Sequence, residues 1–108
     1  MCKLKYWINN TNGFVATCEQ CGNYHLAFGT AMGVVNKAGF ERIAQQVAGL
    51  LKEEAPQNPI SKYAAVCTGP GKNFFVLSWQ ETLDLHDLME KAETEMTACA
   101  MITLLENG

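Results

Sequence analysis

The sequence predicts one α+β domain, residues 1–108, in which an antiparallel sheet carries two helices on one face in the order βββ-α-ββ-α. Three observations lead to this fold class. Short runs of alternating or apolar residues indicate strands, an asparagine precedes an amphipathic stretch, and a serine–glutamate capping box precedes a longer one. A chain of 108 residues can bury such a core without help from a metal or a disulfide.

The first two strands are predicted on either side of an asparagine-rich turn. Lys3 to Ile8 alternates in character, NNTNG follows, and Phe14 to Cys18 is again strand-like. This order is typical of a β-hairpin. Two registers stay open, one with a loop over Asn9 to Gly13 and one with a two-residue turn at Asn12-Gly13.

A third, long strand is predicted from Tyr24 to Val34. Apolar residues keep one parity through this run, while His25, Ala27 and two glycines take the other. We therefore expect His25 on the face opposite Leu26 and Phe28. The glycines indicate a bulge within the strand.

The first helix is predicted over Lys37 to Glu54, with Asn36 as its N-cap. Its apolar residues recur at helical spacing on one face. They are Phe40, Ile43, Ala44, Val47, Leu50 and Leu51. Two prolines between Ala55 and Pro59 end the helix, and Lys62 to Cys67 and Phe74 to Ser78 follow as a second hairpin.

The last helix is predicted to begin at the capping box Ser78-Trp-Gln-Glu81 and to run to about Leu105. Its first part is amphipathic, whereas Met96 to Leu105 is apolar around most of its circumference. Such a helix spans roughly 40 Å, which is more than a domain of this size needs. Either its end tucks across the sheet, or it contacts a partner, most simply a second copy in a homo-oligomer.

Charge and hydropathy exclude two classes of partner. The chain has eight Lys and Arg, of which Arg42 is the one arginine, and eleven Asp and Glu, for a formal net charge of -3. Nucleic-acid binding requires a cationic face, so we do not expect it. No run approaches the ~20 apolar residues of a membrane span, and the N-terminus lacks an apolar signal segment. We therefore expect a cytoplasmic protein, with no membrane partner.

The strongest chemical signature is TCEQCGNYHLAFG, residues 17–29. Two residues between Cys18 and Cys21 allow both thiolates to hold one ion, and the glycine that follows gives the backbone the freedom such a knuckle needs. One pair of thiolates is half of a tetrahedral zinc site. Because His25 and Cys2 are the best-placed further ligands, the sequence predicts a structural zinc site of Cys2, Cys18, Cys21 and His25.

Two alternatives stay open for these thiols. Five cysteines in a chain without an export signal favour reduced thiols over a disulfide framework, and reduced thiols also pack as small apolar side chains. A thiol–disulfide oxidoreductase is the other alternative. Dithiol catalysts place their motif at a helix N-terminus, whereas here the motif leads into a strand and contains Glu19, whose charge opposes a thiolate.

The register of the first hairpin decides whether Cys2 reaches this site. With a loop over residues 9–13, Cys2 lies across from about residue 20 and the ligands converge. With the two-residue turn it faces about residue 23 and lies farther from Cys18.

No other group of residues indicates catalysis. His86 shares a helix face with Glu90 and Glu93, where a solvated His–Glu pair is expected. The segment GPGK, residues 69–72, lacks the spacing of a phosphate-binding loop. No nucleophile can be matched with a base, so the sequence predicts a binding or regulatory protein rather than an enzyme.

The motif C-x-x-C-G-x-Y-H-L-A-F-G, a cysteine at position 2 and a long closing helix after F-V-L-S together resemble an uncharacterised family of short bacterial proteins, a domain of unknown function. The resemblance extends loosely over most of the chain and is specific around Cys18 to Gly29. No activity is established for that family, so the resemblance implies no catalytic residue.

Overall fold

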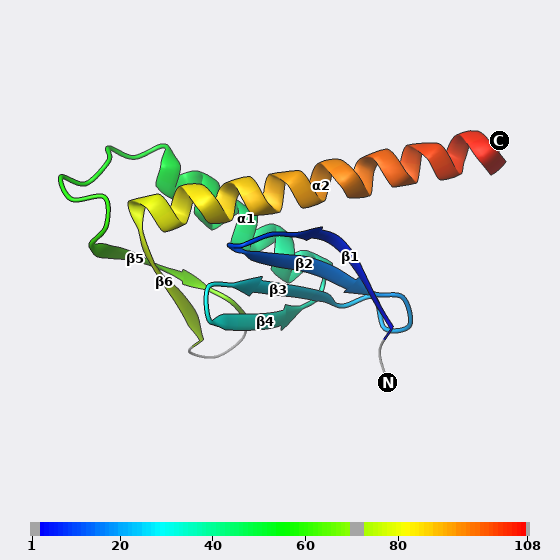
Figure 1. Cartoon of the computed structure of the whole chain (residues 1–108), viewed down its shortest axis with the longest axis horizontal. Helices are drawn as coiled ribbons and strands as arrows, with labels where there is room; N and C mark the ends of the chain where they lie inside the picture. The colour runs from blue at the N-terminus through cyan, green and yellow to red at the C-terminus, as the bar shows by residue number, and fades with distance from the viewer. Residues whose placement is uncertain (1–2, 70–72, 108) are drawn as a thin grey trace.

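The computed structural model describes residues 3–69 and 73–107 and shows two antiparallel sheets and two helices (Figure 1). One sheet has the strand order β1-β2-β3-β4, and the other pairs β5 with β6. This confirms the predicted α+β class. The elements are β1 (Leu4–Asn9), β2 (Gly13–Cys18), β3 (Tyr24–Phe28), β4 (Ala31–Val35), α1 (Lys37–Leu51), β5 (Lys62–Cys67), β6 (Phe74–Ser78) and α2 (Trp79–Asn107).

The stretch predicted as one long strand consists of two strands, β3 and β4. Gly29 has φ +62°, a left-handed conformation that residues with a side chain rarely adopt. The chain therefore reverses there, and Phe28 pairs with Ala31. The observed order is ββββ-α-ββ-α, with β1 and β4 as the edge strands of the larger sheet.

The first hairpin has neither of the two predicted loops. Asn10 and Gly13 exchange two backbone hydrogen bonds, of 2.9 and 3.2 Å, so the turn lies between them. A bulge between Tyr6 and Ile8 then shifts the register, and Leu4 pairs with Cys18. At the beginning of β1 the pairing is therefore the one that the longer loop would give.

The core lies between one face of the four-stranded sheet and the two helices, and β5 and β6 complete it. Val15, Leu26, Phe28 and Val35 are its buried residues from the four-stranded sheet. The helices and the second sheet contribute Phe40, Ile43, Val47, Leu85, Leu88, Met89, Ala92, Val66, Phe75 and Leu77. Since residues alternate along a strand, His25 lies on the face opposite Leu26 and Phe28, as predicted.

Both helices begin at the predicted caps. Asn36 Oδ1 accepts a hydrogen bond from the Gly39 N–H at 2.8 Å, and α1 ends at Leu51 rather than at Glu54. At the start of α2, Ser78 Oγ accepts from the Glu81 N–H at 3.2 Å, and Glu81 Oε1 accepts from the Ser78 N–H at 3.0 Å. This reciprocal pair satisfies two of the backbone donors that a helix start leaves open.

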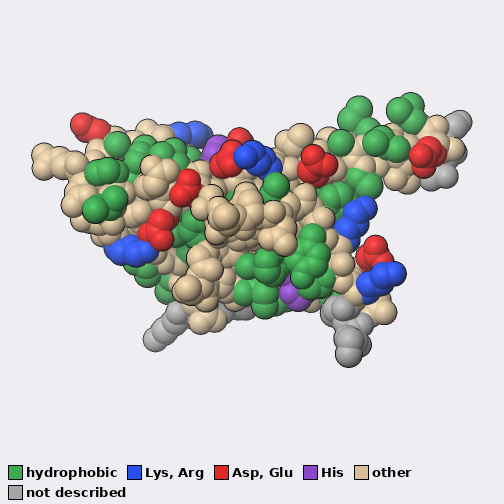
Figure 2. All heavy atoms as spheres, in the orientation of Figure 1, with side chains coloured by type: hydrophobic (Ala, Val, Ile, Leu, Met, Phe, Trp, Pro, Cys, Tyr) green, Lys and Arg blue, Asp and Glu red, His purple; other side chains and the backbone are tan. Residues whose placement is uncertain are grey.

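The end of α2 extends beyond the sheets (Figure 1). Its large apolar side chains, from Met101 to Leu105, are more than half exposed, and hydrophobic side chains gather on this projecting end in Figure 2. The exposed fractions are 59% for Met101, 55% for Ile102, 73% for Leu104 and 82% for Leu105. The helix end is therefore not tucked across the sheet, and the partner interpretation stays a prediction.

Candidate functional site

The C-x-x-C motif forms the turn that joins β2 to β3. The Cys18 N–H donates to the Asn23 carbonyl oxygen at 2.9 Å, and the Gly22 N–H donates to the Cys18 carbonyl oxygen at 2.9 Å. Gly22 has φ +75°, so a side chain at this position would strain the turn. The backbone freedom that the sequence assigns to this glycine is therefore used.

The sulfur of Cys18 accepts a backbone hydrogen bond within the turn. The Cys21 N–H donates to Cys18 Sγ at 3.4 Å. The thiolate is the form of cysteine that binds a metal. Cys18 is buried and Cys21 is exposed, so the first cysteine is anchored in the sheet while the second lies at the surface.

His25 lies on the same sheet face as Cys18. His25 pairs with Ala16 in β2, and Cys18 is two residues further along that strand, so the two side chains are diagonal neighbours. Cys2 lies outside the described residues. Within residues 3–69 and 73–107, no group of three or more His, Cys, Asp or Glu side chains could hold a metal ion. The four-ligand site therefore stays a prediction.

The beginning of β1 reaches the C-x-x-C turn. The Glu19 N–H donates to the Lys3 carbonyl oxygen at 3.1 Å, and Cys2 precedes Lys3 by one peptide bond. The described part of β1 thus has the register on which the four-ligand prediction depends.

The turn has the strand context that the sequence predicted. β2 leads into it and β3 follows it, so the motif is not at a helix N-terminus. The source of thiolate stabilisation that dithiol catalysts use is therefore missing from this part of the described chain. The strand context therefore lacks the feature on which the oxidoreductase alternative depends.

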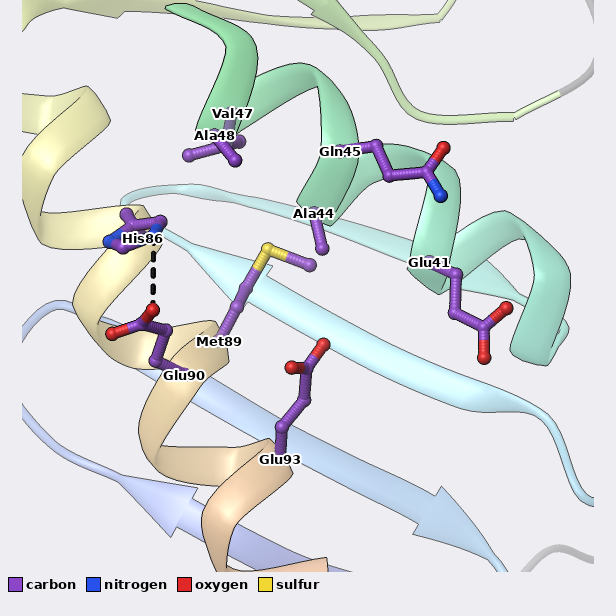
Figure 3. Close-up of a pocket in the computed structure, with 9 residues that line it drawn as sticks. All are labelled: Glu41, Ala44, Gln45, Val47, Ala48, His86, Met89, Glu90 and Glu93. Atoms are coloured by element: carbon purple, nitrogen blue, oxygen red, sulfur yellow. Dashed lines mark ion pairs between the residues drawn. The ribbon is translucent and has the colours of Figure 1, made fainter. Parts of the chain in front are cut away.

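A second candidate site is a groove of about 320 Å³ between α1 and α2 (Figure 3). Glu41 reaches it from α1 and Glu93 from α2, while Met89 extends toward Ala44 between the helices. His86 Nε2 lies 3.3 Å from Glu90 Oε1, which confirms the expected His–Glu pair.

The groove combines carboxylates with one imidazole. Its described lining residues include Glu41, Glu90, Glu93 and His86 and no Ser, Thr, Cys or Lys. The sequence pattern did not single out Glu41, because only the packing of α1 against α2 brings this residue into the same groove as Glu93.

The comparisons with known proteins add no relative. No family model matches the chain, and neither a curated protein nor a solved structure matches it. The resemblance to the family of short bacterial proteins therefore stays a prediction. Within the described ranges, neither helix combines the length and the apolar character needed to cross a membrane.

Proposed function

We propose that this chain is a cytoplasmic, non-catalytic binding or regulatory protein that forms a homodimer through the end of α2 and carries a structural zinc ion at its C-x-x-C turn. The observation that carries the binding role is the exposed apolar segment from Met101 to Leu105. Clusters of large apolar side chains on a surface are typical of protein–protein contacts.

A second copy is the simplest partner for this segment. Every copy presents the same helix end, and two-fold association of identical surfaces is the commonest oligomeric arrangement. Small residues precede the large ones in this part of α2, at Thr97, Ala98 and Ala100. They allow a neighbouring helix to approach closely, because interaxial distance depends on the side chains at the contact.

Light scattering after size-exclusion chromatography tests the dimer. We expect a dimer for the wild type and a monomer for the double variant Leu104→Glu, Leu105→Glu, with unchanged circular dichroism. Ile60→Glu is the matched control, because Ile60 is 79% exposed but lies outside α2. A monomeric wild type at high micromolar concentration, or an equal effect of the control, would contradict the dimer.

The geometry of the turn supports the zinc site. The Cys21 N–H donates to the sulfur of Cys18, and the hydrogen bond between Glu19 and Lys3 holds the start of β1 beside the turn. Cys2 and His25 would complete the four ligands that structural zinc takes. In this role the ion would tie the N-terminus to the edge of the turn and add its binding free energy to folding.

Elemental analysis of protein purified without added metal tests the zinc site. We expect about one zinc per chain and a lower thermal midpoint after chelation. Cys21→Ser and Cys2→Ser should abolish zinc binding, whereas Cys99→Ser on α2 should not. Cys21 is preferred to Cys18 because it is exposed, so its substitution leaves the core intact.

Thiol counting on the same samples separates the zinc site from the oxidoreductase alternative. A zinc site predicts thiols that become reactive only after chelation. An oxidoreductase predicts metal-free protein in which mild oxidation joins Cys18 to Cys21. Metal-free protein whose thiols and stability do not respond to a chelator would overturn the zinc proposal.

A further inference from the structure

A second cavity lies on the side of α1 opposite the groove with α2. Its volume is about 730 Å³, and it is bounded by Asn23 in the turn between β2 and β3, the end of β4, the first turns of α1, and the end of β5 with Gly69. Along α1, positions 36, 39, 42 and 46 line it, a spacing that places all four on one face of the helix. The residues that make up the cavity are thus distant in sequence and are assembled only by the fold.

The charge of this cavity is opposite to that of the whole chain. Arg42, the one arginine in a chain with eleven Asp and Glu, lines the cavity, and none of the described lining residues is acidic. The ion pairs within residues 3–69 and 73–107 join Lys62 to Glu81, His86 to Glu90 and Lys91 to Asp87. None of these pairs uses Arg42, so its guanidinium is available to a ligand.

The first turn of α1 reinforces this polarity. It contains no acidic residue, in contrast to the first turn of α2, which contains Glu81. Asn36 Oδ1 accepts from the Gly39 N–H, so the Nδ2 group of the same side chain remains as a donor beside the cavity. Gln46 has a structural role instead, because both atoms of its amide bond the backbone of Cys67.

Apolar residues of two strands also line the cavity. Val34 and Val35 line it from β4, and Cys67 lines it from β5. A ligand that fits this arrangement presents an anionic group to Arg42 and an apolar body to the valines. A guanidinium matches the geometry of carboxylate and phosphate groups, which it binds through paired hydrogen bonds.

We propose that the cavity between β4, α1 and β5 binds a small organic anion, with Arg42 as the residue that holds its anionic group. The cavity borders the C-x-x-C turn at Asn23, but none of the four proposed zinc ligands and no residue of α2 is among its described lining residues. Binding of an anion can therefore be tested independently of zinc binding and of the dimer.

Amide chemical shifts in a titration of the full chain test the site. The probes are inorganic phosphate, a phosphate monoester such as phenyl phosphate, and the carboxylates from acetate to hexanoate. We expect shifts at residues around Asn36, Arg42 and Cys67. Affinity that rises with carboxylate chain length identifies a carboxylic acid as the ligand class, whereas preference for phenyl phosphate over every carboxylate identifies a phosphate ester.

Three variants decide whether Arg42 and the polarity of the cavity are responsible. Arg42→Gln should weaken binding at least tenfold. Asn36→Asp should weaken it similarly, because Asp caps a helix as well as Asn does but adds a carboxylate to the cavity. Lys52→Gln makes the same charge change at the other end of α1 and should alter affinity less than twofold. Equal effects of Arg42→Gln and Lys52→Gln, or no shifts with any probe, would overturn the proposal.

Discussion

The side-chain amide of Gln46 exchanges two hydrogen bonds with the backbone of Cys67. Gln46 Oε1 accepts from the Cys67 N–H at 3.0 Å, and Gln46 Nε2 donates to the Cys67 carbonyl oxygen at 3.1 Å. Within the described part of the chain β5 pairs only with β6, so its other edge leaves backbone groups without a neighbouring strand. The glutamine therefore takes the place of a strand partner and fixes α1 to the second sheet.

Gln46→Ala should lower the free energy of unfolding by about 1–3 kcal/mol, because it removes two hydrogen bonds and leaves backbone groups of Cys67 unsatisfied. Urea denaturation measures this change. The neighbouring Gln45 is exposed and faces the groove between the helices, so Gln45→Ala should change stability by no more than about 0.5 kcal/mol. Equal costs for the two variants would show that the edge contact contributes nothing.

Substitution by alanine should change the free energy of unfolding in opposite directions at two glycines, Gly13 and Gly49. A Cβ at Gly13 would lie 1.9 Å from the Ala27 carbonyl oxygen, so Gly13→Ala must separate β2 from β3 and should cost more than about 3 kcal/mol. A Cβ at Gly49 would meet nothing within 4 Å. Gly49→Ala in α1 should therefore stabilise the protein by about 0.5–1 kcal/mol. Thermal unfolding of both variants checks the signs, and destabilisation by Gly49→Ala would contradict this account.

The element types could be predicted because local signals agree with the fold. Asn36 and Ser78 directly precede the helices that they cap, so each helix start is marked by a local signal. The helical spacing of the apolar residues in α1 matches its buried face. The division of β3 from β4 was missed for a different reason. The parity of the apolar residues is the same before and after Gly29, so the pattern does not reveal the reversal that its positive φ produces.

The register of β1 beside the C-x-x-C turn depends on a tertiary contact that no local sequence pattern reveals. The bulge in β1 directs both Trp7 and Ile8 toward the core, and Trp7 Nε1 donates to Thr17 Oγ1 at 2.8 Å. Since a strand otherwise alternates faces, tertiary packing selects this geometry. The cavity around Arg42 could not be predicted for the same reason, because segments distant in the sequence form it.

Thr17→Val should cost about 1 kcal/mol, because it keeps the shape of the side chain but removes the acceptor for the partly buried Trp7 N–H. Thr17→Ser is the control that keeps the hydroxyl. Unfolding monitored by circular dichroism gives the stabilities, and tryptophan fluorescence in a Trp79→Phe background reports on Trp7 alone. A larger loss in the serine variant than in the valine variant would assign the role of Thr17 to its methyl group.

Glu81 belongs both to the capping box and to a surface ion pair. The Lys62 ammonium, which donates a hydrogen bond to Glu81 Oε1, and the backbone N–H of Ser78 lower the pKa of the Glu81 carboxyl from its ordinary value. A carboxyl whose pKa is lower in the folded state than in the unfolded state adds stability at pH values above the unfolded-state pKa of about 4.3. That stability is lost as the pH falls through the folded-state pKa.

Glu81→Gln isolates this charge, because glutamine at the same position still completes a capping box. The wild type should exceed the variant in free energy of unfolding near neutral pH, and the difference should vanish in acid. Since Lys62 and Glu81 are both solvent-accessible, we expect a difference below about 1 kcal/mol. Denaturant titrations over this pH range measure it, with the exposed Glu53→Gln as a control for net charge. A difference that persists in acid would assign the effect to the shape of the cap rather than to the charge.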